Sequence, residues 1–400
     1  MEQALKHTRA HFDRYRQPVK ESYIDVLDGV RAVLVLLVGA FHIWQQSWLT
    51  PRFLIFGKYY SLDFLLRSGY IWVDGLILLS GFLLYLPYAR AGNGPLPPVG
   101  PYLRKRFLRI WPSYALNVIL FFFLAVQKYN GNTAYMAKDL AAHLTFTHPF
   151  FESTYYGSPI NGALWTVGIE WWFYLLFPLV GRCYRKKPML TAGAMIAAAF
   201  LFRAYVKTLP DTRMWFNQLP AFLDVYALGF VGADAFVALR RREAGKTKQE
   251  KRLFAFICLM SVLFLIWICK SQAASNGQEG IRHGQMDHRF PLALSLMVLM
   301  VSLPFATAPL RWFFGNRVMR FLSQVSFQFY MYHQVIAVQM KERRWIPSVS
   351  MEPHRDSERP WQIVYTLCCF AVPLVVSAVL TYGFEKQVIR LFDKRKGRKT

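Results

Sequence analysis

Residues 27–42 read LDGVRAVLVLLVGAFH, an apolar run that carries Arg31 near its start and His42 eleven positions later. At about 100° and 1.5 Å per residue, eleven positions of an α-helix return to within about 20° of the same face, about 16 Å further along the axis. Ionisable groups inside a membrane-spanning helix are costly unless they face protein or water, so they mark functional sites. The run therefore predicts a membrane-spanning helix with one functional polar stripe.

The whole chain has the composition of a membrane protein. Of its 400 residues, 54% are hydrophobic and 17% are aromatic, which exceeds what a soluble domain of this length buries or exposes. Apolar runs of about 17 to 25 residues are long enough to cross a bilayer. We therefore expect an all-α polytopic membrane protein with about ten transmembrane helices. They are placed at residues 26–45, 70–88, 112–127, 163–181, 189–206, 217–239, 252–270, 290–308, 318–338 and 362–385.

The basic residues predict the orientation of these helices, because cytoplasmic loops are enriched in Lys and Arg. With the N-terminus inside, the inner segments carry 31 of the 48 Lys and Arg residues and the outer segments carry 15. Both termini are therefore expected in the cytoplasm. The predicted organisation is a cytoplasmic N-terminal segment at 1–25, a ten-helix membrane domain at 26–385 and a basic cytoplasmic tail at 386–400.

The net charge of +25 follows from this topology and from attraction to anionic lipid head groups, so we expect no nucleic-acid partner. Residues 1–25 are polar and contain acids, which is not typical of a cleaved signal peptide. The five cysteines show no spacing typical of zinc ligands. We therefore expect neither a metal nor structural disulfides.

Polar residues inside the expected spans fall into two layers. The layer expected in the outer half of the membrane contains His42, Asp74, Glu170 and His333. The layer expected near the inner face contains Arg31, Arg104, Arg106 and Arg109. Histidine suits general-base catalysis, and a nearby carboxylate can orient it. Arginine suits phosphates, which it meets in a forked geometry. Coenzyme A fits both layers, since its pantetheine arm is comparable in length to the spacing between Arg31 and His42.

Several of these residues also have structural explanations. Asp28 and Arg31 are three positions apart and could form an ion pair at the start of a helix, and the arginines at 104–109 are typical of inner-face anchors. Aromatic residues are compatible both with an interfacial belt and with sugar stacking; they include Trp44, Trp48, Trp165, Trp171 and Trp172. The expected outer loop at 128–162 is also rich in aromatic residues, and it carries the same two interpretations.

Five segments in order resemble the membrane acyltransferase 3 family, whose members O-acylate polysaccharides and small molecules. YIDVLDGVRAVLVLLVGAFH resembles the family's LDGLRG opening with its Arg-x10-His pattern, and VDGLILLSGF resembles VDxFFxxSGF. RFLRIWPSY, LWTVGIEWWFYLLFPL and SFQFYMYHQV resemble RRxxRIxPxY, LWSLSVEEQFYLLFPL and SYSLYLWHxPV. The chain departs from the family at Trp171, which replaces the second acid of the EE pair, so any role of that carboxylate is missing.

The resemblance implies an integral membrane O-acyltransferase of the bacterial cell membrane. It would move an acyl group, by resemblance acetyl, from cytoplasmic acyl-CoA to a hydroxyl of a glycan, lipid-linked sugar or other small acceptor at the outer side. His42 takes the position of the family's essential histidine, either as general base or as transient acyl carrier. Glu170 is expected to orient or charge-stabilise a histidine, with Asp74 and His333 on the same wall. Arg106 and Arg109, with Arg31 and Arg104, are expected to bind the donor's phosphates.

Two other classes of protein stay open at this point. A secondary transporter or flippase of a sugar or lipid-linked sugar also has about ten helices and charges near the midplane, although the sequence shows no inverted repeat. A structural subunit of a polysaccharide export assembly is the third possibility. It predicts that His42 can be replaced without consequence.

Overall fold

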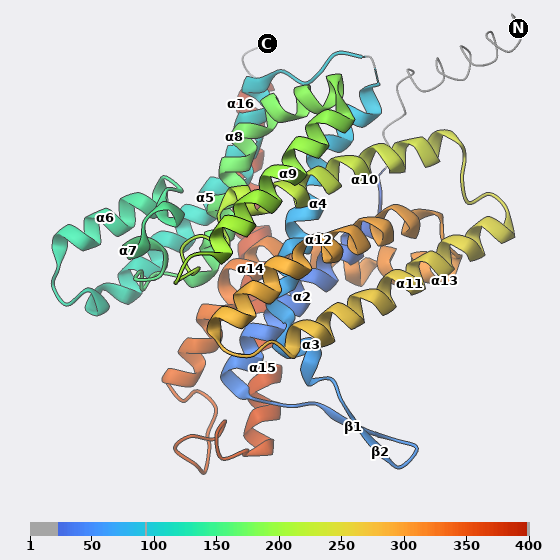
Figure 1. Ribbon diagram of the computed structural model, residues 1–400. Coiled ribbons are helices and arrows are strands. Elements are labelled where there is room, and N and C mark those ends of the chain that lie inside the picture. Colours follow the sequence, from blue (N-terminus) through green and yellow to red (C-terminus); the bar gives the residue numbers. More distant parts are fainter. Residues whose placement is uncertain (1–22, 93, 398–400) are drawn as a thin grey trace, which may run out of the picture. The chain divides into compact units, whose positions relative to one another are not determined.

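The structure is a computed structural model that describes residues 23–92 and 94–397 (Figure 1). It is built almost wholly of helices. The ten long ones are α2 (Val26–Ser47), α4 (Trp72–Ala91), α5 (Val99–Ala125), α8 (Trp165–Lys186), α9 (Pro188–Lys207), α10 (Leu223–Arg241), α11 (Lys248–Ala273), α12 (Gln278–Ser302), α14 (Arg317–Glu342) and α15 (Arg359–Leu380). Each of the ten expected apolar runs lies mostly within one of them.

Within the described residues, nine helical stretches are long and apolar enough to cross a membrane. This confirms the all-α polytopic membrane architecture. The exception among the ten is α14, a 26-residue helix over the run expected at 318–338. Its Ser, Gln and His side chains lower its hydropathy, and one of them, His333, forms polar contacts described below.

Short elements connect the long helices. The helical ones are α3 (Asp63–Arg67), α6 (Thr133–Leu144), α7 (Glu152–Tyr155), α13 (Ala308–Gly315), α16 (Lys386–Gly397), the 3₁₀ turns η1 (Gly69–Ile71), η2 (Val126–Tyr129), η3 (His148–Phe150), η4 (Gly162–Leu164), η5 (Leu219–Phe222) and η6 (Leu303–Phe305), and the π-helical turn η7 (Thr381–Glu385). The expected tail therefore begins as helix α16. The expected N-terminal segment lies, up to residue 22, outside the described residues.

Two strands, β1 (Arg52–Ile55) and β2 (Lys58–Ser61), form an antiparallel hairpin after α2 (Figure 1). Phe56 and Gly57 at its tip have φ values of 48° and 75°, as in the turns whose twist matches that of paired strands. Aromatic and aliphatic side chains are exposed on both strands: Phe53, Leu54, Tyr59 and Tyr60. The hairpin was not expected from the sequence. Alternation of polar and apolar residues over strands of only four residues is a weak signal.

The chain divides into two compact units. Among the described residues, the first comprises 23–31, 73–92, 94–101 and 176–320, and the second comprises 32–72, 102–175 and 321–397. In the first unit, α4 and α10 meet almost backbone to backbone. A Cβ at Gly229 would lie 2.7 Å from the backbone nitrogen of Phe82 and 2.8 Å from the carbonyl oxygen of Leu78. Glycine is therefore needed where these two helices pack.

In the second unit, α2, α14 and α15 share a buried apolar cluster. Its members are Ile43, Ala337, Met340, Trp361, Tyr365 and Cys369. The Tyr365 hydroxyl donates a 2.6 Å hydrogen bond to the carbonyl oxygen of Ala337, which satisfies its one polar group inside this cluster. The cluster fixes α2 beside α14 immediately after His42.

Candidate active site

His42 on α2 and His333 on α14 form a hydrogen-bonded pair. The Nδ1 atom of His42 lies 2.8 Å from the Nε2 atom of His333. His333 is completely buried, whereas His42 is half-buried. The two helices approach closely because Gly39 lies one turn before His42, and a Cβ there would be 2.7 Å from the Phe329 ring. Two histidines that are 291 positions apart in the sequence thus meet in one place.

The hydrogen bonds of this pair determine which nitrogen carries each proton. The Nδ1 atom of His333 lies 2.9 Å from the carbonyl oxygen of Phe329, which can only accept, so this nitrogen donates. The Nε2 atom of a neutral His333 therefore accepts the hydrogen bond from Nδ1–H of His42. His42 is left with a lone pair on Nε2, the nitrogen that faces away from its partner. A histidine held in this tautomer can act as a base or as a nucleophile.

Two asparagines hold the turn of α14 that carries His333. The carbonyl oxygen of Met331 accepts hydrogen bonds from Asn161, at 2.8 Å, and from Asn117 on α5, at 3.2 Å. Asn161 also donates to Asn117 at 3.0 Å, and it accepts from the backbone of Ala163 in η4. Neither asparagine was expected from the sequence. The available signal was an asparagine within the apolar run of α5 and another three positions before the start of the LWTVGIEWW motif.

Glu170 on α8 lies in the same unit as the histidine pair. Its carboxylate accepts a hydrogen bond from Tyr174, one turn further along the helix, and it interacts electrostatically with Tyr330. The ring of Tyr330 lies 6.1 Å from that of His333 between centroids, and its hydroxyl accepts a bond from Thr166. His42 donates its hydrogen bond to His333, and Glu170 lies next to the tyrosines around that pair.

Arg106 on α5 lies against two aromatic rings. Its guanidinium carbon is 5.4 Å from the ring centre of Tyr174 and 5.5 Å from that of Tyr102, within range of a cation–π contact. Its Nε atom is buried and has no hydrogen-bond partner among the described residues. Arg104 and Arg109 on the same helix are exposed.

The other two expected site residues belong to the first unit. Asp74 on α4 is buried and forms an ion pair of 3.1 Å with Nε of Arg289 on α12. Arg289 also donates to the side chain of Asn217 at 2.8 Å and to the carbonyl oxygen of Phe216 at 2.9 Å. Arg31 lies on α2, which is unbroken from Val26 to Ser47, so the expected helical spacing between Arg31 and His42 holds.

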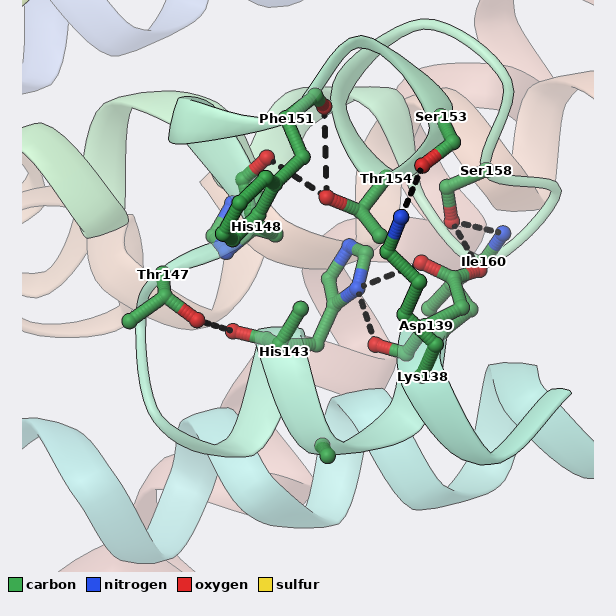
Figure 2. A network of polar contacts seen from close by, with 12 residues as sticks. Lys138, Asp139, His143, Thr147, His148, Phe151, Ser153, Thr154, Ser158 and Ile160 are labelled. Carbon is green, nitrogen blue, oxygen red and sulfur yellow. Dashed lines mark hydrogen bonds and ion pairs between the residues drawn. The ribbon is translucent and has the colours of Figure 1, made fainter. Parts of the chain in front are cut away.

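A second polar network lies in the second unit, within the residues that connect α5 to α8 along the chain (Figure 2). The Nδ1 atom of His143 on α6 lies 3.1 Å from the carboxylate of Asp139, whose other oxygen accepts from Ser158 and Tyr129. The rings of His143 and His148 stack at 4.2 Å. Burial, followed by the neighbouring His143, lowers the pKa of His148 well below its usual value. Among residues 23–92 and 94–397, no three His, Cys, Asp or Glu side chains are grouped to hold a metal.

The structure is that of a polytopic helical membrane protein in which His42 and His333 form a hydrogen-bonded pair. A family model described as an acyltransferase domain, that of the acyltransferase 3 family, matches residues 24–382. The chain belongs to this family and is an acyltransferase.

Three relatives support this assignment. A candidate acetyltransferase of Acidianus two-tailed virus is 23% identical over 82% of this chain and 85% of its own length. The acyltransferase MdmB of Streptomyces mycarofaciens is 28% identical over 48% of this chain and 51% of its own. Nodulation protein 10 of Rhizobium leguminosarum bv. viciae is 28% identical over 32% and 37%. No solved structure matches the chain.

Proposed function

We propose that this acyltransferase moves an acyl group, acetyl in the simplest case, from cytoplasmic acyl-CoA to a hydroxyl of a glycan, lipid-linked sugar or small acceptor at the outer side of a bacterial cell membrane. The observation that supports the proposal most is the hydrogen bond from Nδ1 of His42 to Nε2 of His333. It leaves the lone pair of His42 Nε2 available for a proton or an acyl carbon.

In the direct mechanism, His42 Nε2 takes the proton from the acceptor hydroxyl as its oxygen attacks the thioester carbonyl. The tetrahedral intermediate then collapses, the carbon–sulfur bond breaks, and the imidazolium returns its proton to the leaving thiolate. The products are the acyl ester and free CoA. His333 acts as a positioning residue, because its hydrogen bond fixes the tautomer of His42.

In the covalent mechanism, Nε2 itself attacks the thioester, the carbon–sulfur bond breaks, and the CoA thiolate leaves. The acceptor oxygen then attacks the acyl-imidazole carbonyl, the carbon–nitrogen bond breaks, and the hydroxyl proton passes to the thiolate, which gives the acyl ester and free CoA. Rapid-quench labelling with radioactive acetyl-CoA in the absence of acceptor separates the two mechanisms. Label that is lost in the His42→Ala variant supports the covalent route. A variant that retains wild-type transfer would remove His42 from either mechanism.

The donor is proposed to bind through its phosphates to Arg106 and Arg109, with Arg104 contributing charge. Arginine in a fixed orientation is well suited to phosphate, and Arg106 is held against Tyr102 and Tyr174. Replacing Arg106 by Lys keeps the charge but loses the planar group, so we expect weaker donor binding with little change in kcat.

Thermal stabilisation by CoA tests the proposal first. A ligand bound only by the folded protein raises its stability by RT ln(1 + [L]/Kd). We expect a saturable rise in the Tm of the detergent-purified protein, reduced in Arg106→Gln and Arg109→Gln. No shift at millimolar CoA would contradict acyl-CoA as the donor.

A further inference from the structure

Trp48 differs from the other tryptophans near the motifs. Of the five tryptophans compatible with either a membrane belt or sugar stacking, Trp44, Trp165, Trp171 and Trp172 are partly buried. Trp171 stacks on Phe146 at 4.9 Å, and the indole nitrogen of Trp172 donates to the carbonyl oxygen of Phe146. Trp48, in contrast, exposes 47% of its surface.

The backbone of Trp48 is in an unfavourable conformation. Helix α2 ends at Ser47, and the amide of Trp48 continues its hydrogen bonding by donating to the carbonyl oxygen of Trp44 at 2.8 Å. The φ angle of Trp48 is 53°, in the left-handed region that glycine normally occupies after a helix. A bulky side chain there is a genuine outlier, and such outliers are concentrated at functional sites.

The segment around Trp48 is held on both sides by residues of α14 and α15. Lys341 donates a 2.8 Å hydrogen bond to the carbonyl oxygen of Gln46, and Arg359 donates one of 3.2 Å to that of Thr50. The rings of Trp48 and His354 are nearly perpendicular, at 79°, with their centroids 5.1 Å apart. This contact supports the indole, while the residue remains 47% exposed.

We propose that Trp48 is an acceptor-binding residue and that its indole face stacks on a saturated ring that carries hydroxyl groups, that is, on a sugar. Trp48 follows His42 by six positions, about 9 Å along the helix axis, a distance that a sugar chain can bridge. The acceptor of an O-acyl group must have hydroxyls, and a flat apolar indole face requires C–H groups on one side of a ring. A pyranose has both. This inference rests on the proposed function and names the substrate class of the same site.

Steady-state kinetics with acetyl-CoA as donor test whether Trp48 stacks on the acceptor sugar, which we call its platform role. The acceptor probes are methyl glycosides of two-residue pyranose chains of glucose, galactose, mannose or rhamnose, which are long enough to reach from Trp48 to His42, with glycerol as the acyclic control. In Trp48→Leu, which keeps an apolar side chain without a ring, we expect KM for the preferred pyranoside to rise at least tenfold while kcat and KM for acetyl-CoA stay unchanged. Trp48→Phe should recover most of the affinity. Trp48→Gly should raise KM in the same way and yet raise Tm, because glycine adopts the observed φ without strain.

A binding measurement that needs no turnover separates this inference from the proposed function. With 5-fluorotryptophan incorporated, the resonance of Trp48 is assigned by its loss in Trp48→Phe. We expect a pyranoside to shift this resonance and glycerol to leave it in place, with the exposed Trp312 of α13 (71% exposed) as an unmoved internal control. A shift without acyl transfer would retain the platform and reject the reaction. An unmoved Trp48 resonance with all four pyranosides, or an unchanged KM in Trp48→Leu, would reject the platform.

Discussion

The Cβ position of Gly39 on α2 points at the ring of Phe329 on α14, 2.7 Å from its Cε1 atom. The same ring stacks on His333 at 5.3 Å and 12° between planes. The absence of a side chain at residue 39 thus lets His333 come within hydrogen-bonding distance of His42.

Gly39→Ala is expected to move Phe329 and, with it, His333. Overpacking of this kind costs about 1–3 kcal/mol, so we expect a lower Tm together with a loss of transfer activity that exceeds the loss of folded protein. Gly193→Ala is the matched control, since a Cβ at this helical glycine of α9 meets nothing within 4 Å. An active Gly39→Ala enzyme would show that the close approach is not needed for catalysis.

The tautomer of His42 can be tested by changing its partner. The His333→Leu variant leaves Nδ1–H of His42 without its acceptor. We therefore expect kcat to fall by about 10²–10⁴-fold, the range of rate that general-base catalysis contributes. The His333→Gln variant offers a side-chain carbonyl oxygen in place of Nε2, so it should recover part of the kcat that is lost in His333→Leu. Measurement of kcat against pH for both variants, with CoA protection to confirm folding, checks this; equal rates in the two variants would contradict it.

The buried His148 predicts a loss of stability in acid. Its pKa is depressed in the folded protein, whereas in the unfolded chain it is about 6.5. Below pH 6.5 the unfolded state therefore binds more protons, and stability falls by about 1.4 kcal/mol per pH unit until the folded-state pKa is reached. Above pH 6.5 the full contribution is present.

His148→Phe should keep the stacking on His143 but remove this proton-binding site. We expect the Tm of the variant to be less dependent on pH between 6.5 and 5 than that of the wild type, with similar values at pH 8. Parallel Tm curves for the two proteins across this range would count against the explanation.

Variants of the ion pair between Asp74 and Arg289 can distinguish a structural role of Asp74 from a catalytic one. Replacing one partner leaves the other charge buried, which costs about 3–5 kcal/mol. We expect Asp74→Asn and Arg289→Gln each to lower Tm sharply, and the double variant to recover both stability and activity. A double variant that folds well but is as inactive as Asp74→Asn would give Asp74 a direct role in the reaction.

The ten long helices could be predicted because apolar runs of membrane length are set by local composition. The histidine pair could be predicted only in part. The motifs marked His42 and His333 as polar positions in one half of the membrane, but their contact depends on Gly39 and on the packing of α2 against α14, which no single segment encodes. Glu170 was expected to orient or charge-stabilise a histidine, without a statement of which one, and in the structure the hydrogen bond of His42 is to His333.

The residues that were hardest to predict are those whose side chains hold a residue of another helix in place. Asn117 and Asn161 were not selected, because an amide in an apolar run does not reveal that it will bond to a backbone carbonyl 170 or more positions away. Arg289 was counted as a loop cation, yet it is among the largest fully buried side chains. Its burial depends on the ion pair with Asp74, and the hydropathy of the sequence places Asp74 in a different helix.

The β1–β2 hairpin has a practical consequence for work with the purified protein. Two strands alone are only marginally stable in water, and this ribbon presents unpaired outer edges together with aromatic side chains on both strands. Such edges are templates for pairing with a second molecule. Concentrated samples in detergents with small micelles are therefore expected to self-associate through residues 52–61, and a lysine in place of Tyr59 should keep them monodisperse.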